Sequence, residues 1–405
     1  MTSGPAVPPG RATALRRSLG LEGGVAALAA GLFVFGFGQE LWFRYVPEYL
    51  RFLGAAPFLI GVFGTLKDLL DAAYAYPGGA ITDRIGTRAA LLLFGVVTLA
   101  GFLVFALWRS IAGVFAGIVL VMAWPSLGLP ATFAMIGEEL RGAKRIVGFT
   151  VQAVVKRIPI VIAPVVGGVL IGRLGMLRGM RAGFFASIAL AAVMILGLAA
   201  VFRNGRTAPA VPPGAVRLPP VLRRLVAADV LVRLCEGLPD VFLVVWVIEV
   251  RGFSAAWFGV LVSILTATSI VSYVPAAALA ERAEKKRFIV LTYAFFTLFP
   301  VAVFAARTFA ALAAAFAIGG LREIGEPARK AFIVDSSPAH ARGRTVGKYY
   351  TIRGFSVAGA AAIGGLLWTI APRWTFLAAA GLGAAGTVGA AVFLPRSGKR
   401  PDSPA

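Results

Sequence analysis

Apolar runs long enough to cross a membrane recur along the whole sequence, and they limit the possible folds more than any other feature. A helix needs about 20 residues to cross the hydrocarbon core. The 405-residue chain is 59% hydrophobic and 14% charged, whereas a soluble protein carries about 25% charged residues. The pattern predicts an all-α membrane protein with twelve transmembrane helices. We place them at 24–49, 56–80, 88–108, 110–137, 146–172, 180–202, 224–249, 255–280, 287–306, 308–335, 345–371 and 374–395.

Hydrophilic segments at the ends and in the middle divide the chain into domains. Residues 1–23 are rich in Pro, Gly and Arg, and they predict a disordered cytoplasmic tail. The apolar run after them is too long for a removable signal peptide, so we expect it to remain as the first span. A second Pro- and Arg-rich segment, 203–223, predicts a cytoplasmic linker between a six-helix bundle at 24–202 and another at 224–395. Residues 396–405 predict a cytoplasmic C-terminal tail.

The net charge of +22 indicates the orientation of the chain rather than a nucleic-acid partner. The basic residues are scattered between the spans and do not gather on one soluble face, so we expect no nucleic acid to bind. With both termini in the cytoplasm, more than half of the 40 Lys and Arg residues fall in the cytoplasmic connections and tails. By the positive-inside rule this favours a multi-pass protein of the inner (plasma) membrane, surrounded by the lipid bilayer.

The second half of the sequence repeats landmarks of the first half in the same order. Pro77 recurs as Pro275, Asp83-Arg84 as Glu281-Arg282, Gly61 as Gly259, Gly128–Ala131 as Gly325–Ala328, Lys156 as Arg353, and Gly167-Gly168 as Gly364-Gly365. So many correspondences in register indicate a duplicated six-span unit with parallel orientation. Such a repeat is typical of secondary transporters, in which two halves rock about a central site.

Residues 77–88, PGGAITDRIGTR, join the second span to the third. A phosphate-binding loop is excluded, because no GK[ST] follows and no strand precedes the stretch. The stretch resembles the inner-loop signature of the major facilitator superfamily: glycine, then Asp-Arg, glycine and a basic residue. The repeat, the span count and the central linker extend this resemblance over nearly the whole chain. A plain polar turn with positive-inside arginines would explain the charge but not the duplicate.

The resemblance implies that family's twelve-helix fold and a gating role for this motif and its copy. In the family, the motif aspartate, here Asp83, pairs with basic groups and a helix N-terminus of the other half, which helps to hold the inner side closed. The gate residues that the resemblance implies are Gly78, Gly79, Asp83, Arg84, Gly86 and Arg88, with Glu281 and Arg282 in the copy.

Ionisable residues inside the spans point to a functional site, since each is costly in hydrocarbon. The third, sixth, ninth and twelfth spans carry none in their interiors, and the family fold places these helices at the periphery. In the seventh span, Asp229, Arg233, Glu236 and Asp240 share one helix face. We therefore expect charges of both signs to converge on one central cavity.

Two interpretations of these charges remain open. Neutralising pairs such as Arg233–Glu236 and Arg322–Glu326 would stabilise helix contacts only, although buried ion pairs stabilise a fold little. Alternatively, carboxylates change protonation during transport while cations hold the solute. The proton-coupling candidates are Glu236, Glu326, Asp71, Asp68 and Glu40. The substrate-cavity candidates are Arg233, Arg322, Lys156, Arg353, Lys67, Asp240 and Arg329.

The sequence lacks the residues that an enzyme or an ATP-driven pump needs. It has no ATP-binding motif, one cysteine (Cys235) and one histidine (His340), so we expect no catalysis, metal or cofactor. The segment APVVGG at 163–168 partly resembles the helix-5 signature of proton-coupled antiporters, which favours export, although helix packing alone also explains it.

We therefore expect a secondary active transporter, monomeric, that moves a small polar solute by alternating access. The solute classes include anionic metabolites and drug-like compounds, and the expected mode is proton-coupled efflux. A proton-coupled symporter for uptake and a uniporter share all the features described so far. A non-transporting sensor of the same fold is a more distant alternative.

Overall fold

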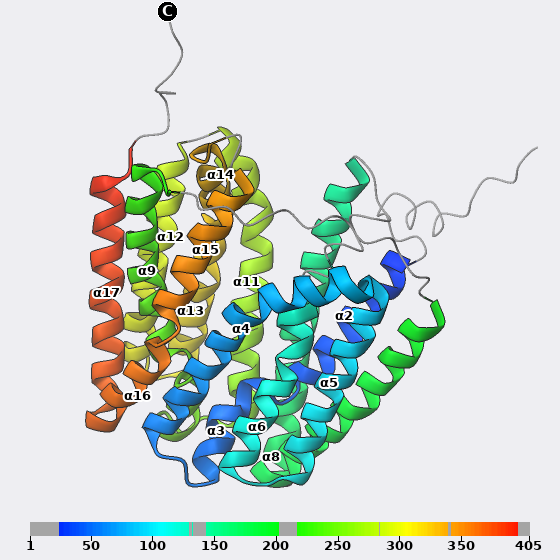
Figure 1. Cartoon of the computed structure of the whole chain (residues 1–405). Helices are drawn as coiled ribbons and strands as arrows, with labels where there is room; N and C mark the ends of the chain where they lie inside the picture. Colours follow the sequence, from blue (N-terminus) through cyan, green and yellow to red (C-terminus); the bar gives the residue numbers. More distant parts are fainter. Residues whose placement is uncertain are drawn as a thin grey trace, which may run out of the picture.

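The computed structural model describes residues 24–128, 132, 143–201, 217–282, 284–338 and 342–395, and these residues form a bundle of helices without a β-strand (Figure 1). The predicted all-α class is therefore confirmed. The predicted tails at 1–23 and 396–405, most of the linker and His340 lie outside the described residues.

The first half of the chain supplies the elements that correspond to the first six predicted spans. They are α2 (Gly24–Glu40), η1 (Phe43–Tyr45), α3 (Val46–Phe52), α4 (Pro57–Ile85), α5 (Thr87–Leu107), α6 (Ile111–Val121), η2 (Ala123–Leu127) and α8 (Ala143–Val201). Gly175, with φ 78°, breaks α8 into two helices that correspond to the fifth and sixth spans.

The second half follows the same plan from α9 onwards. Its elements are α9 (Pro220–Asp240), α10 (Leu243–Val245), η3 (Trp246–Val250), α11 (Ala255–Arg282), α12 (Lys285–Ala305), α13 (Phe309–Gly320), η4 (Leu321–Glu323), α14 (Glu326–Asp335), α15 (Arg342–Val357), α16 (Ala360–Ile370) and α17 (Pro372–Phe393). In Figure 1 these elements, from green to red, lie beside the blue-to-green elements of the first half.

Several predicted spans are not single continuous helices. The fourth consists of α6 followed by the π-helical η2, and the tenth consists of α13, the 3₁₀-helical η4 and α14. By length and composition, six helices within the described ranges are apolar enough to cross a membrane, and one of them is the long run that Gly175 breaks. Charged residues within α4 and α9 lower the hydropathy of these two helices.

The spans without interior charges present apolar side chains to the surroundings. Leu93 on α5, Val193 and Leu196 on α8, Leu298 on α12 and Val388 on α17 are all exposed. A surface of this kind suits contact with lipid, because hydrocarbon accepts apolar side chains without cost.

The two halves meet through repeat-related glycines, where α4 crosses α16 and α11 crosses α8. A Cβ atom on Gly61 would lie 2.4 Å from the Ala361 carbonyl oxygen, and one on Gly259 would lie 2.4 Å from the Pro164 carbonyl oxygen. Only glycine permits backbones to approach this closely. The duplicated glycines thus make equivalent contacts in the two halves.

Polar contacts join the halves at the end of the molecule where the Gly61 and Gly259 contacts lie, which we call the closed end. The Tyr45 hydroxyl donates to the Ala255 carbonyl oxygen of the second half at 3.0 Å, and to the Pro164 carbonyl oxygen of its own half at 2.6 Å. The Arg51 guanidinium pairs with Glu249 at 3.0 Å. Every hydrogen bond or ion pair that joins two described residues across the halves lies here or near mid-depth. The opposite end, where α4 meets α5, is the open end.

Gly86 is the single residue between α4 and α5, and its backbone (φ 84°, ψ 154°) lies in a region that is essentially restricted to glycine. We expect Gly86→Ala to lower the free energy of unfolding by about 1–2 kcal/mol, because the added Cβ strains this conformation. Unfolding in detergent measures the change. Gly197→Ala is the control, since Gly197 lies in α8 with no atom within 4 Å of the added Cβ. Equal stability of the two variants would contradict the expectation.

Candidate functional site

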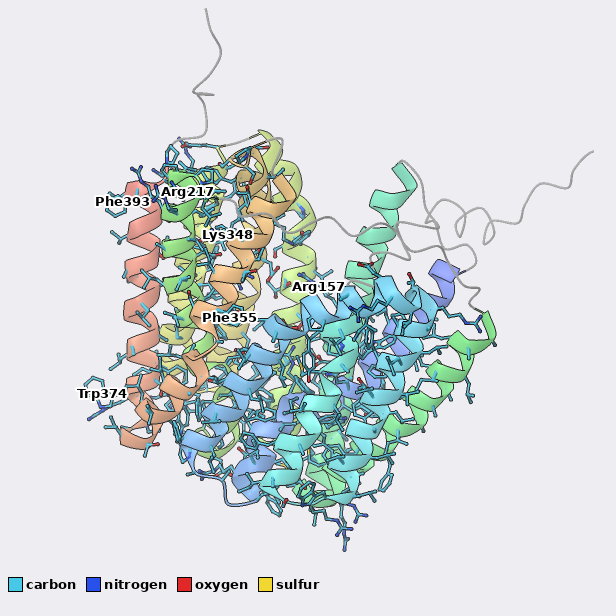
Figure 2. All side chains as sticks on the ribbon, viewed as in Figure 1. Arg157, Arg217, Lys348, Phe355, Trp374 and Phe393 are labelled. Atoms are coloured by element: carbon cyan, nitrogen blue, oxygen red, sulfur yellow. The ribbon has the colours of Figure 1, made fainter. Side chains whose placement is uncertain are left out.

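Ionisable side chains of both halves meet around the middle of the bundle, between the closed and open ends. Figure 2 places Arg157 of α8 at the junction of the two halves. The ionisable groups fall into three sets: a buried cluster in the second half, pairs that join the two halves, and residues that line a cavity in the first half.

The buried cluster in the second half is centred on Asp229 of α9, whose side chain is fully buried. Its carboxylate accepts hydrogen bonds from Arg329 at 2.7 Å, the Tyr349 hydroxyl at 2.9 Å and the Tyr293 hydroxyl at 3.1 Å. Arg329, which is 2% exposed, also binds Glu326 at 2.7 Å. Each charged group of the cluster is therefore compensated by a partner, as burial requires.

Arg233 connects this cluster to the cavity between the halves. It binds Glu236 at 2.8 Å and Glu326 at 2.6 Å, and the other oxygen of Glu236 receives Arg322 at 3.3 Å. The suggested Arg233–Glu236 pair is thus present, whereas Arg322 pairs with Glu236 and not with Glu326. The reason is local: Arg322 lies in 3₁₀-helical η4 and Gly325 precedes α14, so the α-helical spacing that would join Arg322 to Glu326 is interrupted.

Arg353 of α15 is less fully paired than Arg233, Arg322 and Arg329, which all donate hydrogen bonds to carboxylates. Its Nη1 atom is buried without a hydrogen bond and lies 3.6 Å from the Asp229 carboxylate. The guanidinium also lies over the Tyr350 ring, at 4.7 Å from the ring centre. Such a group retains capacity to bind an anion.

Two sets of contacts link the halves near mid-depth. Lys67 of α4 lies 3.3 Å from Asp68 and 3.5 Å from Asp240 of α9. Arg157 of α8 binds Glu323 at 3.0 Å and donates to another residue of the second half, Ser269. The charged face of α4 is therefore directed toward α9, and that of α8 toward η4 and α11.

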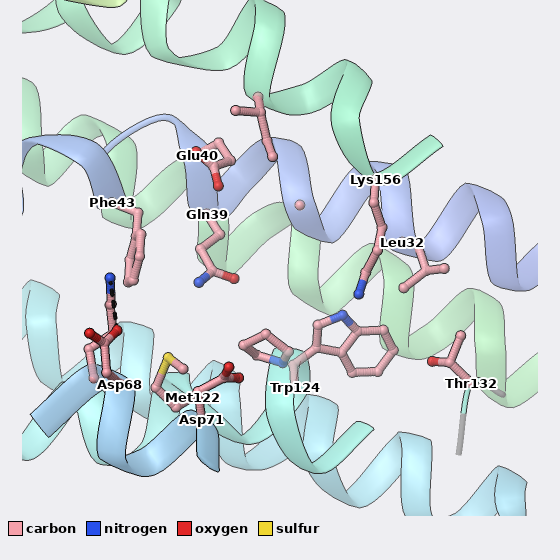
Figure 3. Close-up of a pocket in the computed structure, with 14 residues that line it drawn as sticks. Leu32, Gln39, Glu40, Phe43, Asp68, Asp71, Met122, Trp124, Thr132 and Lys156 are labelled. Atoms are coloured by element: carbon pink, nitrogen blue, oxygen red, sulfur yellow. Dashed lines mark ion pairs between the residues drawn. The ribbon is translucent and has the colours of Figure 1, made fainter. Parts of the chain in front are cut away.

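The first half encloses a cavity of about 430 Å³, which we call the N-half cavity (Figure 3). Its walls include Leu32, Gln39, Glu40, Lys67, Asp68, Asp71, Trp124, Lys156 and Ile160. Glu40 pairs with Arg44 at 3.1 Å, and Asp71 accepts a hydrogen bond from the Ser126 hydroxyl at 2.7 Å.

A second cavity, the central cavity, has a volume of about 420 Å³ and lies between the halves. Its charged walls are formed by Lys67, Asp68, Asp71, Arg233, Glu236, Asp240 and Arg353. Because Lys67, Asp68 and Asp71 line both cavities, the two are neighbours along α4. Eleven of the twelve coupling and cavity candidates line one of these cavities or pair directly with a residue that does, and Arg329 is linked to them only through the buried cluster.

The residues of the predicted gate lie at the open end. Asp83 and Arg84 are exposed near the end of α4, and the Arg88 guanidinium donates to the Ala199 carbonyl oxygen. No contact between these three residues and the other half is found within the described ranges. A Cβ atom on Gly78 would lie 2.3 Å from the Leu127 carbonyl oxygen, so this glycine has a packing role.

For the gate residues Gly79, Glu281 and Arg282, the structure gives the position in a helix. Gly79 lies within α4, and Glu281 and Arg282 are the last residues of α11. Their gating role, like that of Asp83, stays a prediction.

Sequence reasoning missed some of the polar residues in and around these cavities. Tyr293 lies on α12, in a span without interior charge, and nothing in its sequence context indicates that it binds Asp229. Gln39 directly precedes Glu40 and lines the N-half cavity. A rule that included uncharged amides next to buried carboxylates would have found it.

Comparison with known proteins agrees with the architecture. Residues 225–405 match the sequence model of the Major Facilitator Superfamily. No similar sequence was found among curated proteins.

Among solved structures, the chain resembles three kinds of transporter. A POT family transporter in complex with a thioalcohol-conjugated peptide has a TM-score of 0.75 at 15% identity, over 92% of this chain and 95% of that chain. The nucleoside transporter NupG has a TM-score of 0.76 at 12% identity, over 91% of this chain and 99% of that chain. A bacterial homologue of the human lysosomal transporter Spinster, inward-facing and unoccupied, has a TM-score of 0.69 at 13% identity, over 92% and 94%.

At these identities the solved structures establish the fold, and the sequence match covers the second half. The second half of the chain thus matches the Major Facilitator Superfamily in sequence, and the described part of the chain has the fold of these transporters.

Proposed function

We propose that this protein is a secondary active transporter that moves a small polar solute across the membrane by alternating access, with proton-coupled efflux as its mode. The observation that carries the proposal is the set of paired charges from both halves around adjoining cavities at mid-depth. Intramembrane charges that face a cavity mark solute and proton pathways. The structural relatives named above include transporters of peptides and nucleosides, which supports a polar solute.

The orientation and the state of the protein follow from the same proposal. Arg84 and Arg88 flank the Gly86 connection between α4 and α5, and the positive-inside rule then assigns the open end to the cytoplasm. The contacts between the halves at the closed end would make this the form that is open to the cytoplasm. In this form Asp83 is exposed, and the proposed gate would pair Asp83 with the other half only after the open end closes.

Proton coupling is proposed for Glu236 ahead of the other carboxylates. Its side chain is 29% exposed and lines the central cavity, so protons and solute can reach it. It binds both Arg233 and Arg322. An anionic solute group that bound either arginine would weaken the interaction of that arginine with the Glu236 carboxylate. Solute binding and protonation of Glu236 would thereby be linked.

The transport proposal is tested in proteoliposomes with a panel of labelled polar solutes. We expect counterflow of at least one solute, and its accumulation when a pH gradient is imposed. The direction of solute flux relative to the proton gradient distinguishes efflux from symport. Solute flux through a uniporter would not depend on the pH gradient. Absence of counterflow for every solute would contradict transport itself.

Glu236→Gln is expected to retain counterflow but to lose accumulation driven by the pH gradient, because an amide cannot carry a proton. The measurement compares the two assays on the same proteoliposomes. Glu284→Gln is the control, since Glu284 pairs with Arg287 at the open end. Unchanged pH-driven accumulation in Glu236→Gln would exclude Glu236 as the coupling residue.

A further inference from the structure

The N-half cavity contains one anion and one cation that have no ion-pair partner within the described ranges. Five ionisable residues line it. Glu40 is paired with Arg44, and Lys67 is paired with Asp68. When these pairs are set aside, Asp71 and Lys156 are left.

Asp71 and Lys156 attract each other electrostatically but are not joined by an ion pair. They come from different helices, α4 and α8, and Figure 3 shows both side chains directed into the same cavity, with Lys156 beside the Trp124 indole. The Ser126 hydroxyl holds the Asp71 carboxylate in place at 2.7 Å. The cavity is thus prepared for a solute that carries a positive group and a negative group at separate points.

The space around these two charges is mixed in character. Leu32, Trp124 and Ile160 supply apolar surface, and Gln39 supplies an amide that has no hydrogen-bond partner in the part of the chain that the structure describes. A volume of about 430 Å³ lies within the roughly 300–1,000 Å³ range of small-molecule sites. A purely anionic solute would leave Asp71 beside it without compensation, and a purely cationic solute would do the same for Lys156.

We propose that the N-half cavity binds a small zwitterionic amino-carboxylate with an apolar body, its ammonium group at Asp71 and its carboxylate at Lys156. The inference rests on the proposed transport function, since it names the solute class of that same site. Gln39 would bond to the polar part of the solute between the two ends.

The test is a binding measurement, which does not depend on transport. Purified protein in nanodiscs is titrated, by thermal shift and calorimetry, with leucine, N-acetylleucine and leucinamide, and with ω-amino carboxylates of three to eight carbons. These compounds carry both charges, the negative charge only, the positive charge only, and both charges at graded separations. We expect zwitterions to stabilise the protein and to bind about tenfold or more tightly than either single-charge analogue, as the loss of one ion pair predicts.

Variants assign each end of the solute. Lys156→Gln should bind leucinamide as well as leucine, and Asp71→Asn should bind N-acetylleucine as well as leucine. Lys330→Gln and Asp335→Asn, on the exposed surface of α14, should keep the preference of the unmodified protein. Unfolding of each solute-free variant verifies that its fold is intact.

Three results would overturn the inference: no binding by any zwitterion, equal binding of N-acetylleucine and leucine by the unmodified protein, or an unchanged preference in both cavity variants. None of these would affect the transport proposal if another solute shows counterflow. Conversely, zwitterion binding without counterflow of any solute would support this site and contradict transport.

Discussion

Asp229→Ala is expected to lower the free energy of unfolding by about 3–5 kcal/mol, the usual cost of removing one partner from a buried ion pair. Asp229 is fully buried and faces Arg329, which is 2% exposed. Without the carboxylate, Glu326 is the one ion-pair partner that Arg329 keeps among the described residues, and the hydroxyls of Tyr293 and Tyr349 lose their acceptor. Each unsatisfied buried hydroxyl adds to the cost.

Chemical or thermal unfolding in detergent measures the loss, and Asp335→Ala provides the matched control. Asp335 pairs with Lys285, but its side chain is 61% exposed, so its removal should cost about 0–1 kcal/mol. Asp229→Asn should fall between the two, because the amide still accepts hydrogen bonds from the tyrosines but does not compensate Arg329. Similar stability of Asp229→Ala and Asp335→Ala would contradict the assignment of Asp229 as an anchor of the second half.

This expectation bears on the two interpretations that the sequence left open. The Asp229, Glu326 and Arg329 groups are buried and mutually compensated, which suits a structural role. Glu236 and Asp71 face cavities, which suits solute and proton binding. We therefore propose that both interpretations apply, each to a different part of the same charged region.

Hydrophobicity predicted the positions of the helices well, because a membrane-spanning segment must be apolar over its whole length. It also predicted which helices lie outside: α5, α12 and α17, without interior charges, expose apolar side chains such as Leu93, Leu298 and Val388. The duplicated glycines revealed the repeat, although their close backbone contacts became apparent only in the structure. These features are local, or they repeat in the sequence, so a single chain displays them.

The ion-pair partners were harder to predict, because they depend on how helices break and cross. Hydropathy does not reveal the π-helical η2 or the 3₁₀-helical η4, and the second of these redirects Arg322 from Glu326 to Glu236. The Lys67–Asp240 pair joins helices from different halves, and helical spacing within one span cannot predict it. The hydrogen bond from Tyr293 to Asp229 forms because α12 packs against α9, so the sequence around Tyr293 alone cannot predict it.

The glycine contacts at the closed end are expected to affect the equilibrium between the two conformations of the proposed transport cycle. In the proposed cycle the halves separate at the closed end when the open end closes, so these contacts exist in one state only. A Cβ atom on Gly259 would meet backbone atoms of α8: the Pro164 carbonyl oxygen at 2.4 Å and the Val165 Cα at 2.8 Å. A helix backbone cannot yield as a flexible side chain does, so the substitution acts as a wedge between the halves.

We expect Gly259→Ala to shift the population toward the state that is open at this end. Overpacking of about 1–3 kcal/mol corresponds to roughly a 5- to 150-fold change in the ratio of the two states. Gly61→Ala should shift the population in the same direction, since Gly61 makes the repeat-related contact with Ala361. Gly172→Ala is the control, because the added methyl group would lie in open space on α8.

Spin labels at Phe52→Cys and Val250→Cys measure the shift, since both positions are exposed at the closed end, one in each half. Cys235 is fully buried and is expected to stay unlabelled. The distance between the labels should lengthen in Gly259→Ala and Gly61→Ala but not in Gly172→Ala. If the distances stay the same while the proteins remain folded, the glycine contacts do not govern the opening of this end, because a wedge that separates the halves must move the labels apart.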